Sequence, residues 1–127
     1  MPRETFSPNS SNKPSGFSPI TQSGNFLFVS GQVSVNSGGD LVGSTDCYLQ
    51  AKQCFSNIET VLQSAGATFD DLVKITAFIV KSRDYPDYAK ARLEIFPENG
   101  PASSTVFISG LVRPEFLIEI EAIAALD

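Results

Sequence analysis

The chain has 127 residues, of which 42% are hydrophobic and 18% charged, so it can form one globular domain with its own core. Its 14 acidic and 9 basic residues give a net charge of −5, and the sequence contains no histidine. The acidic charge argues against binding to a nucleic-acid backbone, and the missing histidine excludes Ser-His-Asp and Cys-His catalysis. Any general acid or base must then be a carboxylate, Lys, Tyr, Cys or an ordered water.

The N-terminal part of the chain is rich in Ser, Asn, Pro and Thr. We expect a single domain over 1–127 in which residues 1–16 form an irregular arm, and a short strand could form near Phe17–Ile20. The arm lacks the apolar stretch of a signal peptide, and no apolar run approaches the ~18 residues of a membrane span. These features predict a soluble, cytoplasmic protein that does not bind membranes.

A dense run of β-forming residues, FLFVS at 26–30, predicts a strand, and 36–40 reads as a hairpin-like turn. From Asp46 the apolar residues recur at helical spacing as far as Ala65, and Gly66 ends the pattern. This segment predicts an amphipathic helix of about five turns.

Both cysteines, Cys47 and Cys54, lie in this predicted helix. They would be about 10 Å apart along its axis, which is too far for a disulfide bond. We therefore expect two buried free thiols, as suits a reducing compartment.

The second half of the chain continues the alternation of strands and helices. Residues 73–80 predict a strand that places Val73, Ile75 and Ala77 on one face, and 84–95 predict a shorter helix with a proline in its first turn. Residues 104–109 and 116–124 predict two more strands. This order is typical of an α+β fold with a mixed sheet and both helices on one face.

Two carboxylates, Glu119 and Glu121, fall on the same face of the last predicted strand. They could belong to a solvated sheet face, as in many one-sided sheets. Alternatively, one of them could orient water or accept a proton in an apolar cleft. A third interpretation is that oligomerisation buries the face and leaves one Glu at an interface.

Other signals in the sequence are weaker. The segment 30–32 (Ser-Gly-Gln) could offer backbone N–H groups to an anion, or it could be an ordinary turn at a strand end. Basic residues interleave with acidic ones between Lys81 and Arg92, which favours a solvated helix face over a nucleic-acid patch. We interpret the following aromatic residues as core: Phe26, Phe28, Phe55, Phe69, Phe78, Phe96 and Phe107.

Four segments match one known family in order and nearly in spacing. They are FLFVSGQVSV (26–35), NIETVLQSAGATFDDLVKITAFI (57–79), DYPDYAKARLEIFPENGPA (84–102) and LIEIEAIA (117–124). Together they resemble the Rid family, the reactive intermediate deaminases also called YjgF/YER057c/UK114 proteins. The resemblance implies a chorismate-mutase-like fold (bacillus type), with a six-stranded mixed sheet and two helices on one face. It also implies a barrel-shaped homotrimer whose sheets face inward and whose ligand clefts lie between subunits.

The activity implied by this resemblance is hydrolysis of reactive enamines and imines to keto acids and ammonia, with no metal or organic cofactor. The glutamate that positions the attacking water in such a site falls on Glu119. The family's turn is present at Ser30 and Gly31, where a backbone N–H group helps to hold the substrate. A tyrosine of the N-terminal arm falls on Phe17, which lacks the hydroxyl group, and an asparagine of the second helix falls near Ala89.

The main departure from the family concerns the arginine that binds the substrate carboxylate. The family reads Pro-Ala-Arg before the fifth strand, whereas this chain continues after Pro-Ala with Ser103, Ser104 and Thr105. Either serine could be the counterpart, and a serine hydroxyl cannot replace a bidentate guanidinium contact. Arg113 could supply another cation, the substrate could lack the carboxylate, or the site could have kept only binding.

Three functions therefore compete. The first is an imine or enamine hydrolase with a non-standard substrate range, and the second is a non-catalytic protein that binds small metabolites on the same trimer. The third is a ribonuclease, against which the net charge of −5 and the missing histidine both count. The candidate site residues are Glu119 for catalysis and Phe17, Ser30, Gly31, Ser103, Ser104, Thr105 and Arg113 for substrate binding.

Overall fold

A computed structural model of the chain describes residues 3–8 and 14–127. Its strands are β1 (Glu4–Phe6), β2 (Ile20–Ser23), β3 (Phe26–Gln32), β4 (Leu72–Ile79), β5 (Ala102–Phe107) and β6 (Ile118–Ala125). Its helices are α1 (Cys47–Ser64) and α2 (Tyr85–Ile95), with short 3₁₀ helices η2 (Phe69–Asp71) and η3 (Ser82–Asp84). No helix in these ranges is both long and apolar enough to cross a membrane.

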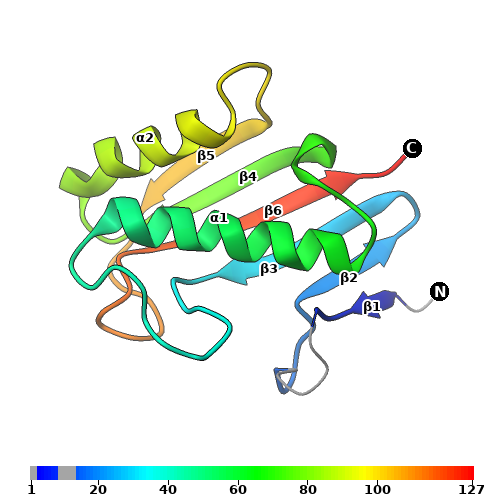
Figure 1. Ribbon diagram of the computed structural model, residues 1–127, viewed down its shortest axis with the longest axis horizontal. Helices are drawn as coiled ribbons and strands as arrows, with labels where there is room; N and C mark the ends of the chain where they lie inside the picture. The colour runs from blue at the N-terminus through cyan, green and yellow to red at the C-terminus, as the bar shows by residue number, and fades with distance from the viewer. Residues whose placement is uncertain (1–2, 9–13) are drawn as a thin grey trace.

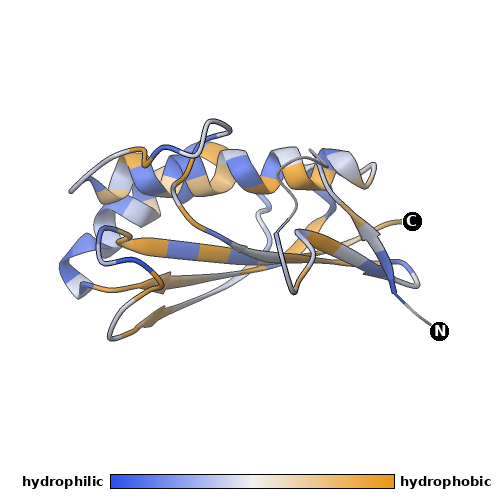
Figure 2. Ribbon diagram, turned by 90° about the horizontal axis from the view of Figure 1, so that it is seen from below, coloured by the Kyte–Doolittle hydropathy of each residue, from blue (hydrophilic) through white to orange (hydrophobic). Residues whose placement is uncertain are grey.

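The six strands form one mixed sheet in the order β1-β2-β3-β6-β4-β5. All neighbours pair antiparallel except β4 and β5, which are parallel and are joined through α2. Both helices lie on the same side of the sheet, and none of the described residues forms a helix on the opposite side (Figures 1 and 2). The α+β fold with two helices on one face is therefore confirmed.

Helix α1 supplies the centre of the core. The Asp46 carboxylate caps it by accepting a hydrogen bond from the backbone N–H of Leu49 (3.0 Å). Both predicted thiols are free and buried. Burial and the nearby acidic side chains raise the pKa of Cys47 to about 12, and burial likewise raises the pKa of Cys54. These thiols therefore stay protonated at neutral pH and are structural rather than nucleophilic.

Helix α2 is held against α1 by aromatic rings. Tyr88 is fully buried and stacks on Phe55 with 6.2 Å between ring centroids, while Phe96 meets Phe55 edge-on at 5.8 Å. This packing sets α2 beside β4 and β5, where its inner side forms one wall of a pocket.

Several predicted boundaries differ from the structure. The arm expected to be irregular contains β1, which pairs with β2, while residues 9–13 of that arm lie outside the described residues. The strand expected near Phe17–Ile20 starts only at Ile20. Strand β5 begins at Ala102, before the predicted start at 104, because its parallel register begins opposite Lys74. These differences arise from pairing with distant strands.

A register shift also changes which side chains of β4 point inward. The shift falls between Leu72 and Lys74 in the pairing of β4 with β6. As a result the side chain of Leu72 points into the core. Val73 is therefore 44% exposed and does not share the buried face of Ile75 and Ala77, contrary to the prediction.

The uncovered side of the sheet carries large apolar side chains. Phe26 and Phe28 on β3 are 51% and 44% exposed, so in a single chain they are not core residues as predicted. Phe107, at the end of the edge strand β5, is also exposed. Phe55 is buried, and Phe96 packs against the core as expected.

Candidate functional site

The registers of β4, β5 and β6 place the candidate residues on two different faces of the sheet. On β4, Phe78 lies opposite Glu119 of β6. Two residues earlier, Thr76 lies between Glu121 of β6 and Ser104 of β5. These two rows of side chains lie on the uncovered face of the sheet. Ser103 instead lies beside the buried Ile75, and Thr105 lies beside the buried Ala77, so both point to the side with the helices. Within one chain, Glu119 and Ser103 therefore lie on opposite faces.

Glu119 sits directly against Gly31 of the neighbouring strand. The pairing of β3 with β6 shifts between Val29 and Gln32, so an extra residue is accommodated around Gly31. A Cβ atom at Gly31 would lie 2.7 Å from Cδ of Glu119 and closer still to Oε2. Only glycine leaves room for the carboxylate in this position, which gives the Ser-Gly-Gln segment a specific structural role.

The carboxyl group of Glu119 is partly buried. Loss of solvation raises its pKa above the ordinary value, and the nearby Glu121 carboxylate raises it further. A carboxyl group with a raised pKa exchanges protons more readily near neutral pH than an ordinary glutamate does. This is the electrostatic property expected of a residue that accepts a proton from water.

Ser30 ties the segment just before β2 to β3. Its hydroxyl donates a hydrogen bond to the carbonyl of Ser18 (2.6 Å), and its backbone N–H donates to the carbonyl of Pro19 (2.9 Å). The N–H of Ser30 is therefore already used within the chain, and the expectation that backbone N–H groups of 30–32 hold an anion stays a prediction for the rest of this segment. Phe17, 62% exposed, lines a hollow beside α1 together with Gly31.

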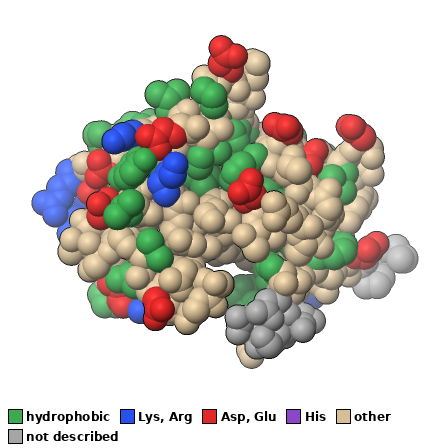
Figure 3. Space-filling model, in the orientation of Figure 1, with side chains coloured by type: hydrophobic (Ala, Val, Ile, Leu, Met, Phe, Trp, Pro, Cys, Tyr) green, Lys and Arg blue, Asp and Glu red, His purple; other side chains and the backbone are tan. Residues whose placement is uncertain are grey.

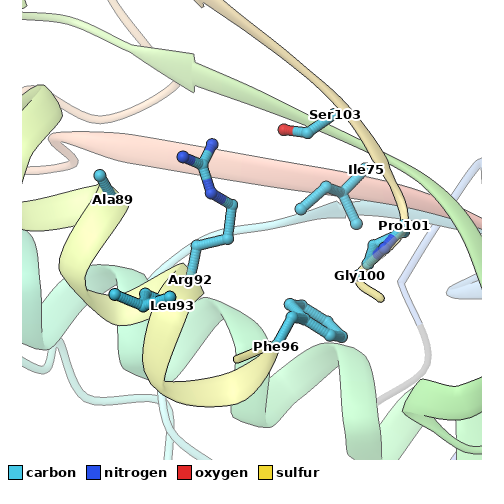
Figure 4. A pocket seen from close by; sticks show the side chains of 8 residues that line it. All are labelled: Ile75, Ala89, Arg92, Leu93, Phe96, Gly100, Pro101 and Ser103. Atoms are coloured by element: carbon cyan, nitrogen blue, oxygen red, sulfur yellow. The ribbon is translucent and has the colours of Figure 1, made fainter. Parts of the chain in front are cut away.

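A second pocket, of about 350 Å³, lies on the helix side between α2 and the β4–β5 edge (Figure 4). Its lining residues are Ile75, Ala89, Arg92, Leu93, Phe96, Gly100, Pro101 and Ser103. Small side chains at Ala89 and Ser103 leave the space open, and Ile75, Leu93 and Phe96 give it apolar walls. Its size is within the range of small-molecule pockets.

The two serine candidates are separated by the alternation of β5. Ser103 faces the pocket, whereas Ser104 lies on the uncovered face and accepts a hydrogen bond from Nζ of Lys74 (2.9 Å). Of the two, only Ser103 is placed to meet a ligand in this pocket. The side chain of Thr105 shares the face of Ser103 but is not part of the pocket lining.

Arg113 does not reach either location. Its guanidinium forms an ion pair with Glu115 (Nη2–Oε2, 2.6 Å) and lies over the ring of Phe116. The side chain is exposed in the loop before β6 and is absent from the lining of the helix-side pocket. Within a single chain it therefore lines neither pocket, and a role as a cation between subunits stays a prediction.

The cation that does line the pocket is Arg92, although the interleaved charges of its segment favour a solvated helix face. Helical spacing carried a signal that was missed, because Arg92 follows the buried Tyr88 by one turn.

Figure 3 shows that basic side chains on the helix side of the molecule lie toward α2 and are interleaved with acidic ones, as predicted. In the described parts of the chain, no group of His, Cys, Asp or Glu side chains is arranged to hold a metal ion.

The comparisons with known proteins agree with this architecture. Residues 9–126 match the family model described as Endoribonuclease L-PSP, and the chain belongs to this family. It is 32% identical over 125 residues to the 3-aminoacrylate deaminase RutC of Acinetobacter baylyi, covering 98% of both chains. It is 31% identical over 111 residues to a 2-iminobutanoate/2-iminopropanoate deaminase of Dermatophagoides farinae, covering 87% of this chain and 86% of the other.

A solved structure extends the agreement to three dimensions. The Rid-family protein YyfA of Yersinia pestis, a protein of unknown function, is 32% identical and has a TM-score of 0.89, with 98% of this chain and 100% of the other covered. The resemblance to the Rid family noted in the sequence is thus confirmed, and with it the six-stranded sheet and its two helices.

Proposed function

We propose that this protein is an imine or enamine hydrolase, a deaminase in which Glu119 positions the attacking water. The observation that carries the proposal is the position of the Glu119 carboxylate, which is half-buried and packed against Gly31. Burial raises the pKa of this carboxylate. The names of two relatives, a 3-aminoacrylate deaminase and a 2-iminobutanoate/2-iminopropanoate deaminase, support the reaction class.

The reaction needs one carboxylate and one water. Water adds to the carbon of the C=N bond while the Glu119 carboxylate accepts one of its protons. That proton is returned to the nitrogen, which gives a neutral carbinolamine. The carboxylate then transfers the hydroxyl proton of the carbinolamine to the nitrogen while the C–N bond breaks, so that ammonia leaves and the C=O bond of the product forms. An imine and water thus yield a carbonyl compound and ammonia, and the carboxylate is regenerated.

The active unit in this proposal is a homotrimer with a small-molecule ligand bound between neighbouring copies. Two observations support it. The side chains of Glu119 and Ser103 lie on opposite faces of one chain, so a single substrate meets both only when a second copy is present. In addition, Phe26 and Phe28 are exposed on the uncovered face, and an assembly whose sheets face inward would bury them.

The experiment is ammonia release from a panel of acidic and neutral imines generated in solution. Wild type should release ammonia from at least one member, and Glu119→Ala should lower the rate about 100-fold or more, as for loss of a general base. Glu121→Ala is the comparison variant: it removes the same charge from the next row of the same face but leaves the Glu119 carboxylate in place, so the rate should fall far less. Equal rates for wild type and Glu119→Ala on every member would reject the proposal.

The alternative is a protein that binds small metabolites without turning them over. Serine at 103 and 104, alanine at 89 and phenylalanine at 17, where the resembled family has functional side chains, favour it. It predicts that metabolites raise the melting temperature while no imine in the panel is hydrolysed. Efficient turnover of any imine would remove this alternative.

A further inference from the structure

The helix-side pocket contains an arginine without a carboxylate partner. The chain has four arginines, at positions 3, 83, 92 and 113, and of these only Arg92 lines this pocket. The ion pairs among the described residues are Lys52–Glu94 and Arg113–Glu115, so within that part of the chain no acidic side chain neutralises Arg92. Its positive charge is therefore available to an anionic ligand.

Two tyrosines hold the guanidinium of Arg92 in place. Nη2 donates a hydrogen bond to the hydroxyl of Tyr85 (3.3 Å), and the guanidinium carbon lies 5.0 Å from the centroid of the Tyr88 ring. The side chain is thus supported from its own helix by groups at i−7 and i−4. A guanidinium has five N–H donors, so most remain free after the single bond to Tyr85.

The free side of the guanidinium faces the strand. Figure 4 shows Arg92 extending from α2 toward β5, where the hydroxyl of Ser103 points into the same space. Ala89, one turn earlier on the helix, adds no bulk between them. The apolar walls formed by Ile75, Leu93 and Phe96 suit a short aliphatic group beside a planar anion.

We propose that Arg92 binds the substrate carboxylate, together with the hydroxyl of Ser103, and thereby selects small 2-imino or enamine acids. This inference rests on the proposed function for the identity of the substrate. The guanidinium forms a charge-assisted, bidentate contact with the carboxylate from the helix side of the pocket, and Ser103 adds one neutral hydrogen bond from the strand. The specificity-determining cation thus lies on α2 and not on β5.

The test measures binding of 2-oxobutanoate, a stable keto acid that carries the carboxylate but does not react. Titration calorimetry on the folded, assembled wild type should show saturable binding, and Arg92→Gln should weaken it about 30-fold, the loss expected for a charged hydrogen-bond pair. Arg83→Gln removes the same charge at an exposed position outside the pocket and should leave the affinity unchanged. Arg92→Lys keeps the charge but cannot make a bidentate contact, so its affinity should lie between those of wild type and Arg92→Gln.

A rescue experiment separates a lost contact from a disturbed helix. The double variant Arg92→Gln/Ser103→Arg returns a guanidinium to the pocket from the opposite wall, and it should recover most of the affinity. Failure of this rescue in a folded protein would overturn the inference. So would binding by Arg92→Gln that matches wild type, an equal loss in Arg83→Gln, or no saturable binding of 2-oxobutanoate by wild type.

The outcome is independent of whether ammonia is released. Binding that depends on Arg92 in a protein without turnover supports this inference and counts against the hydrolase. Turnover of acidic imines that depends on Glu119 but proceeds with an unchanged KM in Arg92→Gln supports the hydrolase and overturns the role of Arg92.

Discussion

The corner formed by Glu119 and Gly31 differs from the pocket of Arg92 and Ser103 in how it is built. At the corner, two adjacent strands near the middle of the sheet bring a carboxylate against a glycine, so the strand register sets where the side chain starts and the glycine leaves it room. In the pocket, a long side chain reaches from a helix toward an edge strand and is held by tyrosines. Position at the corner depends on the sheet register, and position in the pocket depends on side-chain packing.

This difference suggests how one fold can keep its chemistry while its substrate range changes. Moving the carboxylate would require a new register between β3 and β6, which would disturb the core beneath. Moving the guanidinium from a strand to a helix requires only substitutions on the pocket wall. The comparison therefore predicts that changes at the corner abolish turnover, whereas changes in the pocket alter affinity for acidic substrates.

The largest effect is expected from preventing assembly, because this separates the Glu119 corner of one copy from the Arg92 pocket of its neighbour. Phe28→Asp places a charge on the uncovered sheet face, where Phe28 lies opposite Ile123, and should prevent assembly. We expect monomers by size-exclusion chromatography with light scattering, and loss of more than about 100-fold in ammonia release, because in the proposed assembly two copies meet to complete the site. Leu49→Asp, on the exposed side of α1, is the control and should remain assembled and active.

The next effect comes from adding one methyl group at the corner. Gly31→Ala puts a Cβ atom within contact distance of Glu119, so the carboxylate must move away from its position. We expect kcat to fall by roughly 100-fold with a small change in melting temperature, since a flexible side chain can yield. In a Glu119→Ala background the same substitution should have no further effect on kcat, and a full additional loss there would contradict the geometry.

A smaller effect is expected in the pocket. Tyr85→Phe removes the hydroxyl that accepts a hydrogen bond from Arg92, and the guanidinium becomes less well oriented. Affinity for 2-oxobutanoate should fall by about 3-fold, as for one neutral hydrogen bond at an exposed site. Tyr48→Phe, which loses a hydroxyl bonded to Glu94 on the surface, should bind like wild type.

The smallest effect concerns stability and its dependence on pH. The pKa of Glu119 is raised in the folded state, so the folded protein binds its proton more tightly than the unfolded chain does. The charged carboxylate therefore destabilises the fold at neutral pH, and this penalty disappears as the pH falls below the unfolded value. Glu119→Gln should raise Tm by roughly 1–3 °C at pH 7, and the gain should vanish near pH 4, as thermal melts at both pH values would show.

Local periodicity in the sequence determined the main helices and strands and the face of the last strand on which Glu119 lies. Apolar residues at helical spacing placed α1 between Asp46 and Ala65, and strict alternation put Glu119 and Glu121 on one face of β6. Such patterns can be read without the fold, because they follow from the period of a helix or strand. The family resemblance, carried by ordered segments, added the six-stranded sheet.

Only the tertiary structure decided the rest of the site. Which of Ser103 and Ser104 faces the helix-side pocket depends on the register of β5 against β4. Arg92 gains its place from the docking of α2 through aromatic rings. These outcomes follow from contacts between residues far apart in the chain, and no local pattern encodes which strand or helix those residues will meet.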